Sequence, residues 1–349
     1  MKKLLVLLSA VAFVVAFTVP AMSADWGFYG SARMTTFMNS VSEEASATGF
    51  DDDDLTWGLQ GNSRIGAKVK AGDIGGGFEY GASHGNANIR KLYGTWNFGA
   101  GTLLVGQTYT PVNLFYSNQV WGGDTDMLRF GGIFDGRRPM VQLSTGGFKI
   151  ALVEPNTKAL PGYASVDTDT TLPKIEASYG FKAGPVGLTA VGLYNTYDVV
   201  NAADKEEGVD SYLLGLGFNI GLAPAYIKGD VWFGQNLGNT TMWETGTANA
   251  AWVNGDVEDN DNMGYLLVVG FKVSDTLTFE AGYGYAEHDR DDFTTEDDVS
   301  AYYAQATINL AKGAFIVPEV GVVDYGDDPT TGADQGDNTY FGAKWQINF

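Results

Sequence analysis

The chain has 349 residues, a formal net charge of −21 and no cysteine. The lack of cysteine excludes disulfides and thiolate-based metal or redox sites. The acidic balance disfavours nucleic acid as a partner, because a phosphate backbone would be repelled. Glycine contributes 47 residues and aromatic side chains 13%, averages that a soluble secreted β-protein and a membrane β-barrel share. The arrangement of the residues therefore has to decide between them.

The first residues have the pattern of an export signal. Lys2 and Lys3 precede an apolar stretch over residues 4–19, and the sequence AMSA at 21–24 supplies small residues for cleavage. We predict a signal peptide over residues 1–24 and a single domain over 25–349, with a cut after Ser23 as the alternative. Pro20, followed by polar and alternating sequence, disfavours a retained helical anchor. No later stretch approaches the roughly 18 continuous apolar residues that a membrane helix needs.

Residues 55–71 show a strict alternation of apolar and polar side chains. Trp57, Leu59 and Ile65 occupy odd positions, whereas Arg64 and Lys68 occupy even ones. A period of two residues indicates a β-strand with one apolar and one polar face. Soluble strands usually end after about six residues. This length therefore favours a strand that crosses a membrane, with lipid on one face and water on the other.

The last segment of the chain repeats this alternation and ends on an aromatic residue. Five apolar side chains alternate with polar ones there: Phe341, Ala343, Trp345, Ile347 and Phe349. In a soluble protein this strand would leave an apolar stripe at an unprotected sheet edge. A lipid-facing strand is the better interpretation.

The same alternation recurs throughout the chain and predicts sixteen strands. They cover residues 26–38, 55–71, 76–84, 89–98, 102–110, 138–145, 148–154, 173–182, 186–198, 210–220, 225–236, 262–272, 277–287, 299–310, 314–325 and 339–349. Short Gly/Ala-rich connections alternate with long acidic ones. Tyr, Trp and Phe gather near strand ends, where membrane barrels carry aromatic girdles. We therefore predict an all-β fold, a transmembrane antiparallel β-barrel with short periplasmic turns and long outer loops.

Three segments carry a resemblance to a known family. They are NSRIGAKVKAGDIGGGFEYG at 62–81, LYGTWNFGAGTLLVGQTYTP at 92–111 and GIFDGRRP at 132–139. These segments resemble the general trimeric porins of Gram-negative bacteria. The resemblance implies an outer-membrane homotrimer whose third loop, residues 111–137, folds into the barrel. It also implies a water-filled channel for passive diffusion of ions and small hydrophilic solutes.

The C-terminal pattern resembles the final strand of outer-membrane barrels, which the barrel-assembly machinery reads. Trp345, Ile347 and Phe349 would carry that assembly signal here. Two features depart from the family. Gln107 stands where many members have arginine, and the second outer loop, near residues 85–88, is short. The latch onto a neighbouring subunit that some members have is therefore not carried over to this chain.

Conduction needs a narrow zone whose charges set which solutes pass, and no catalytic group. We predict that acids on the third loop face bases on the wall, which creates a transverse field across the pore. The alternative is that these charges are ordinary solvated lumen residues. The candidates are Asp124, Asp126 and Asp135 on the loop and Arg33, Arg64, Lys68, Lys91 and Arg138 on inward positions of the wall.

The predicted outer loops are strongly acidic, over residues 51–54, 256–261, 289–298 and 324–337. We expect a solvated anionic surface, with loop-bound Ca²⁺ as the alternative because carboxylates are its ligands. Divalent ions are also able to bridge such loops to lipopolysaccharide phosphates. No other cofactor is expected. At about 0.15 M salt the screening length is about 8 Å, so these charges act at the mouth and favour cations weakly.

Other function classes find little support. His84 and His288 are the only histidines, which disfavours a histidine-centred catalytic or zinc site. The nearest approach to an outer-membrane hydrolase is His288 beside Asp289 and Asp291. An adhesin or structural barrel is the other alternative, and it would need a small or plugged barrel. Sixteen strands argue against it, because a barrel of that size leaves an aqueous channel.

Overall fold

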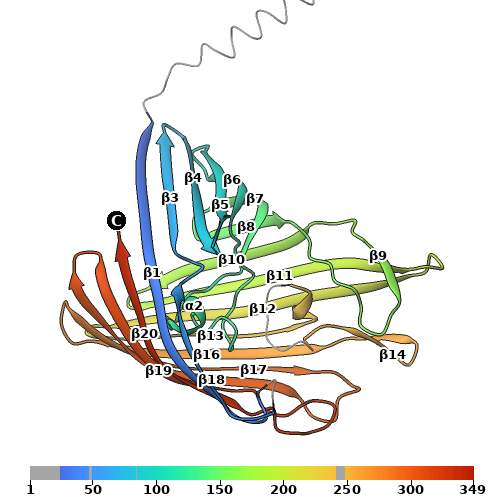
Figure 1. Cartoon of the computed structure of the whole chain (residues 1–349). Helices are drawn as coiled ribbons and strands as arrows, with labels where there is room; N and C mark the ends of the chain where they lie inside the picture. Colours follow the sequence, from blue (N-terminus) through green and yellow to red (C-terminus); the bar gives the residue numbers. More distant parts are fainter. Residues whose placement is uncertain (1–23, 47–48, 84, 241–247) are drawn as a thin grey trace, which may run out of the picture.

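The computed structural model describes residues 24–46, 49–83, 85–240 and 248–349. Its main feature is one antiparallel sheet of eighteen strands rolled into a barrel (Figure 1). Both β2 and β3 pair with β1, and both β9 and β10 pair with β11. Each of these two pairs therefore fills one position, which leaves sixteen strand positions around the barrel. The last strand, β20, pairs with β1 and closes the ring. The predicted closed barrel of sixteen antiparallel strands is confirmed.

The strands lie close to the predicted segments, except for one over residues 165–169 that was not predicted. The first half of the barrel contains β1 (Asp25–Val41), β2 (Asp52–Leu59), β3 (Arg64–Ala71), β4 (Ile74–Ser83), β5 (Asn86–Asn97), β6 (Thr102–Tyr109), β7 (Arg137–Thr145), β8 (Phe148–Val153), β9 (Ser165–Asp169) and β10 (Lys174–Ala183). The second half contains β11 (Val186–Asn201), β12 (Glu206–Leu222), β13 (Ala225–Gln235), β16 (Asp261–Lys272), β17 (Leu277–Asp289), β18 (Asp297–Ala311), β19 (Ala314–Asp324) and β20 (Asp337–Asn348). Among the described residues, no helix is long and apolar enough to cross a membrane.

The prediction of one continuous strand over residues 55–71 is wrong at its centre. The β1 partner of Leu59 is Met34, and that of Arg64 is Ser31. Residues 60–63 therefore face only residues 32 and 33 and form a turn between β2 and β3. The two extra residues are an even number, so the alternation keeps its phase across the break. A sequence pattern of period two cannot reveal such an interruption.

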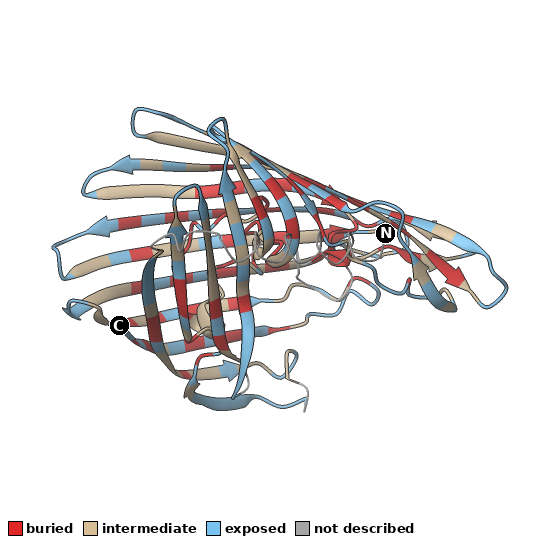
Figure 2. Ribbon diagram, turned by 90° about the horizontal axis from the view of Figure 1, so that it is seen from above, coloured by how far each residue is buried: buried red, intermediate tan, exposed pale blue. Residues whose placement is uncertain are grey.

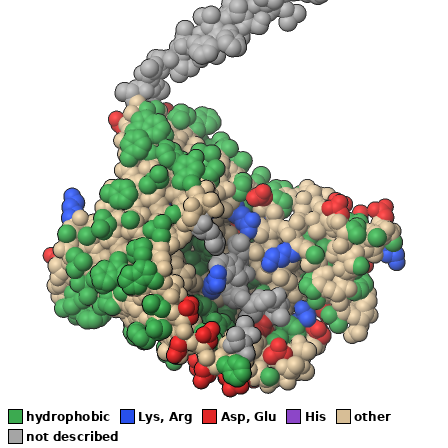
Figure 3. Space-filling view, in the orientation of Figure 1, with side chains coloured by type: hydrophobic (Ala, Val, Ile, Leu, Met, Phe, Trp, Pro, Cys, Tyr) green, Lys and Arg blue, Asp and Glu red, His purple; other side chains and the backbone are tan. Residues whose placement is uncertain are grey.

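Apolar side chains cover the outside of the barrel, as the alternation predicted. The exposed fractions of Trp57 and Ile347 are 70% and 59%. Exposed and buried residues alternate along most strands (Figure 2). The space-filling view shows hydrophobic side chains spread over the outer wall (Figure 3). In a membrane this surface meets lipid, which is why so many large apolar side chains are exposed in the isolated chain.

Short turns join strands at one end of the barrel and mostly longer loops do so at the other, with two short exceptions, β4 to β5 and β11 to β12 (residues 202–205). Only residues 84 and 85 separate β4 from β5, the short second loop expected from the sequence. The longest connections are residues 110–136 and 236–260, and the latter holds an unpredicted hairpin, β14 (Ala251–Val253) and β15 (Asp256–Glu258). Part of the acidic run at 51–54 proved to be strand, because residues 52–54 pair with β1. Residues 1–23 of the predicted signal peptide lie outside the described residues.

Phe349 lies at the seam where the barrel closes. Its N–H donates to the carbonyl of Gly30 at 3.0 Å, and the N–H of Gly30 donates to its carbonyl at 2.7 Å. The Phe349 ring is 72% exposed on the outer face. The end of β20 therefore combines the closing backbone contact with an outward aromatic side chain.

We expect Phe349→Asp to lower the amount of folded, heat-modifiable protein in the outer membrane. A charge on the outer face costs about 2–4 kcal/mol at the midplane and about 0–1 kcal/mol near the interface, so the loss should arise mainly during assembly. Phe50→Asp is a matched control, because Phe50 is 73% exposed and lies in an outer loop. Equal amounts of both variants in purified membranes would contradict a role for this residue in closure.

Candidate functional site

The connection between β6 and β7, residues 110–136, folds into the barrel, as the resemblance implied. We call it the third loop. The buried side chains of Leu114 and Tyr116 lie over Gly217 of β12, where a Cβ atom would come within 2.6 Å of both. The carbonyl oxygen of Phe130 lies 1.8 Å from where a Cβ of Gly284 would stand. The wall thus has room for the loop only because glycine occupies these inward positions.

Buried carboxylates of the wall hold the backbone of the third loop. Glu176 accepts a hydrogen bond from the N–H of Val112 at 3.0 Å. Glu280 accepts one from the N–H of Asn118 at 2.8 Å. Glu319 accepts two, from the N–H groups of residues 120 and 121 at 2.7 and 3.0 Å. Each of these bonds satisfies a backbone N–H group that would otherwise be buried without a partner. These carboxylates therefore fix the loop against the wall.

Side chains add contacts along the same loop. The indole N–H of Trp232 donates to the carbonyl of Gly131 at 2.7 Å. The indole N–H of Trp121 donates to Asn39 at 2.7 Å, and the Trp121 ring stacks on Tyr340 with 4.5 Å between centroids. The loop is consequently held at both its outgoing and its returning arm.

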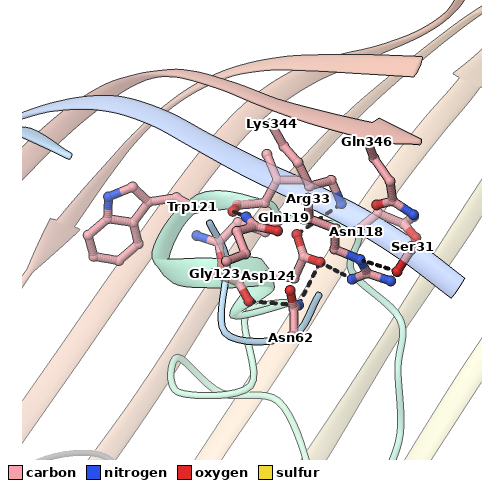
Figure 4. Close-up of polar contacts among 12 residues, drawn as sticks. Ser31, Arg33, Asn62, Asn118, Gln119, Trp121, Gly123, Asp124, Lys344 and Gln346 are labelled. Atoms are coloured by element: carbon pink, nitrogen blue, oxygen red, sulfur yellow. Dashed lines mark hydrogen bonds and ion pairs between the residues drawn. The ribbon is translucent and has the colours of Figure 1, made fainter. Parts of the chain in front are cut away.

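Asp124 ends the short helix α2 (Trp121–Asp124) and is the centre of an ionic network at the tip of the loop (Figure 4). Its carboxylate forms an ion pair with Arg33 of β1 and accepts a hydrogen bond from Lys344 of β20 at 2.9 Å. Asn62 donates to the same carboxylate at 2.8 Å and to the Gly123 carbonyl at 2.9 Å. Asn62 belongs to the turn between β2 and β3. The interruption of that strand therefore supplies a side chain that holds the loop tip.

A second network lies on the wall of β3 to β5. Glu79 is 2% exposed and meets three cationic side chains, Arg90 at 2.8 Å, Lys91 at 3.5 Å and Arg64 at 3.6 Å. Tyr29 donates a further hydrogen bond to it at 2.9 Å. A single carboxylate thus forms ion pairs with three cationic side chains. Arg137 of β7 adds a fourth cation and donates to the hydroxyl of Tyr109 at 2.8 Å. We call Arg64, Arg90, Lys91 and Arg137 the basic wall.

The structure brings some of the predicted constriction residues together. Arg33, Arg64, Asp124 and Asp126 line one cavity of about 560 Å³, and Lys91 lies beside it through Glu79. Figure 3 shows basic side chains within and beside a hollow in the molecule, and acidic side chains along its lower edge. These four residues are the part of the predicted site that shares a water-filled space.

Three predicted residues lie elsewhere. Asp135 is fully buried at the returning arm of the loop, paired with Lys174 and 4.0 Å from Arg138. Lys68 lines a separate cavity near the first residues of β1, with Trp26 and Lys70. Asp135 therefore anchors the loop, and Lys68 lies toward the end of the barrel that carries the short turns.

Sequence reasoning missed several residues of these networks. Lys344 lies on the polar face of the last strand, which the alternation predicted. Its partner, Asp124 of the third loop, could not be predicted from that alternation. Glu79 lies inside the family-like segment at 62–81, so the sequence could have identified it as a charged residue on an inward position. Asn62 and Arg137 also lie in the family-like segments at 62–81 and 132–139. No local signal marked the remaining residues, because their contacts with the third loop depend on how the closed barrel brings distant segments together. The missed residues are Asn62, Glu79, Arg90, Arg137, Lys174, Glu176, Glu280, Glu319 and Lys344.

The outer mouth is acidic in the structure as well. Hydrogen bonds from Arg290 lower the pKa of Asp292, and hydrogen bonds from Thr331 lower the pKa of Asp328. Both carboxylates therefore stay ionised at lower pH than an ordinary aspartate.

Across the described ranges, no three His, Asp or Glu side chains are grouped as metal ligands. His288 is 2% exposed, and its Nδ1 meets the amide of Asn262 at 2.9 Å.

Comparison with known proteins identifies the family. The sequence profile of the Gram-negative porins matches residues 10–328. The chain belongs to this family. It is an outer-membrane porin, a channel for passive diffusion. No curated protein matches it by sequence.

Solved structures share the porin fold at low sequence identity. The outer membrane channel DcaP of Acinetobacter baumannii has 17% identity and a TM-score of 0.72, covering 93% of this chain and 97% of that one. The anion-selective porin of Comamonas acidovorans has 14% identity and a TM-score of 0.62, covering 94% and 100%. The trimer form of OmpT from Vibrio cholerae has 16% identity and a TM-score of 0.61, covering 93% and 99%. These likenesses extend over nearly the whole barrel.

Asp124→Asn and Asp126→Asn each remove one carboxyl group from the loop but should act differently. Asp124 ties the loop tip to Arg33 and Lys344, whereas Asp126 has no ion pair within 4.0 Å in the described part of the chain. We expect both variants to shift the reversal potential toward anions. Only Asp124→Asn should also raise the open-channel current noise, because it frees the tip. Equal noise in the two variants would show that the network does not restrain the loop.

Proposed function

We propose that solutes pass this porin through a constriction with two oppositely charged sides. Basic side chains run along neighbouring strand positions, from Lys344 through Arg33 to the basic wall. Asp126 of the loop and Glu280 of β17 line another side of the same cavity. Opposite charges across a narrow lumen orient dipolar solutes as they pass. The single observation that carries this proposal is the shared cavity of Arg33, Arg64, Asp126 and Glu280.

We propose that the mouth, rather than the constriction, sets the net ion preference. At the loop tip the charges largely offset one another, since Asp124 already neutralises much of the charge of Arg33 and Lys344. The outer loops carry an excess of acid that concentrates cations before entry. The resulting preference for cations is weak and should fade as salt screens the mouth.

Reversal potentials across planar bilayers test this assignment. Under a KCl gradient at low salt we expect a small cation preference that disappears toward about 1 M salt, where the screening length is about 3 Å. Acidification below about pH 4 should also weaken it, as ordinary mouth carboxylates become protonated, while Asp292 and Asp328 lose their charge only at lower pH. Arg64→Gln should strengthen the preference. Anion preference at low salt would mean that the basic side chains dominate.

We propose that the protein assembles as a homotrimer. Family membership and the trimeric form of the similar Vibrio cholerae OmpT support this, and closed cyclic symmetry is the usual form of a homo-oligomer. The short connection between β4 and β5 removes the latch found in some relatives, so the contact would rest on the barrel walls.

Mass measurement of the protein in mild detergent tests the oligomer. We expect a trimer that resists sodium dodecyl sulfate at room temperature and dissociates on heating. A monomer at all detergent and protein concentrations would exclude it.

We also propose partners at the two ends of the barrel and a purely diffusive function. The exposed aromatic and aliphatic face of β20, with Trp345, Ile347 and Phe349, suits recognition by the barrel-assembly machinery. The acidic outer loops suit bridging to lipopolysaccharide through divalent ions. A hydrolase role centred on His288 is disfavoured, because its imidazole is buried and a substrate would not reach it.

A further inference from the structure

We propose that the lumen carries a binding site for small aromatic carboxylates, formed by the exposed ring of Phe115 and by cations of the basic wall. This inference rests on the proposed open constriction and names a solute class for it. The ligand chemistry is one flat ring with one carboxylate, of which benzoate is the simplest example.

Phe115 presents an aromatic ring to the water-filled cavity. Its neighbours Leu114 and Tyr116 are 8% and 9% exposed because they face the barrel wall. The extended backbone turns Phe115 the other way, where it is 43% exposed and lines the same cavity as Arg64 and Tyr109. An apolar ring facing water is unfavourable unless something covers it. The ring of a passing solute is able to do so.

Neighbouring rings hold Phe115 in place. Tyr109 meets it edge-on with 4.9 Å between centroids, and Phe134 does so at 6.0 Å. Edge-to-face contact is a preferred geometry for aromatic pairs. Because Phe115 is already fixed, a ligand that stacks on it does not have to order it, which favours binding.

The basic wall supplies positive charge beside this aromatic group. Arg64, Arg90 and Lys91 share the single carboxylate of Glu79. Arg137 has no carboxylate within 4.0 Å in the described part of the chain, and its guanidinium lies over the Tyr109 ring at 5.1 Å. The Lys91 ammonium lies 5.2 Å from the same ring centroid. Four cations against one acid leave a local positive excess, and guanidinium groups match carboxylates in geometry.

Tyr109 links the two halves of the proposed site. It contacts Phe115 on one side and both Arg137 and Lys91 on the other. A solute with only a charge would use the cations, and a neutral ring would use only Phe115. A solute that carries both groups gains from both contacts at once, so aromatic carboxylates should be retained longest.

Block of single-channel KCl current tests the proposal on the purified porin. Benzoate is the probe, and cyclohexanecarboxylate is the comparison because it has the same charge without an aromatic ring. We expect benzoate to block at an approximately three- to tenfold lower concentration, the range that an aromatic contact provides. Benzyl alcohol, which lacks the charge, should block far more weakly than either.

Variants locate the site. In Phe115→Leu the ratio of the two blocking concentrations should fall to about one, whereas Phe315→Leu should keep it, although Phe315 lines the same cavity. Because the ratio compares two blockers of similar size in the same variant, a change in channel width affects both and cancels. Arg137→Gln and Lys91→Gln should weaken block by both carboxylates alike.

Two outcomes would overturn the inference. They are equal block by benzoate and cyclohexanecarboxylate in the unaltered protein, and a benzoate advantage that survives in Phe115→Leu. A protein that conducts no KCl current at all would refute the proposed channel itself. Normal conductance without selective block would refute only the aromatic site.

Discussion

Closure of the sheet is the constraint on which the rest of this structure depends. Inside a bilayer each unpaired backbone N–H or C=O group costs several kcal/mol, so no sheet edge can remain open. The pairing of β1 with β20, from Ser31 with Asn348 to Val41 with Asn338, removes the last edge. Closure also separates two solvents. The outer face meets lipid and the inner face meets water, which is why exposed and buried residues alternate along most strands.

A closed wall creates an enclosed space in which a loop is able to lie without a core of its own. The third loop has only one short helix, and four of its backbone N–H groups are satisfied by Glu176, Glu280 and Glu319 of the wall. These acids occupy inward positions that simple patterning would assign to the solvated lumen. The wall is therefore complementary to the loop. Glycine occupies the wall positions that the loop approaches most closely, and carboxyl groups lie where they accept hydrogen bonds from loop N–H groups.

The sequence predicted the barrel well and the constriction only in part. Alternation is a local property, so each strand was visible in its own residues, as at 339–349. The break at residues 60–63 was hidden because its two extra residues preserve the phase. Pairing within the lumen is not local. Lys344 meets Asp124, which lies 220 positions earlier in the chain, and only the closed ring brings them together. Lys68 and Arg64 share a strand face, but their depths in the barrel differ, which a period of two cannot express.

Charge acts in this channel over two distances, and this separates ion preference from solute recognition. The acidic loops at the mouth influence any ion that approaches, but screening at about 0.15 M salt limits them to about 8 Å. Deeper in the lumen a solute responds to the groups that it touches. There Asp124 is already paired with Arg33 and Lys344, whereas the basic wall retains an excess of cations around Glu79. If the mouth confers the weak cation preference proposed above, the lumen is still able to hold an anion locally, because the two effects would come from different residues at different depths.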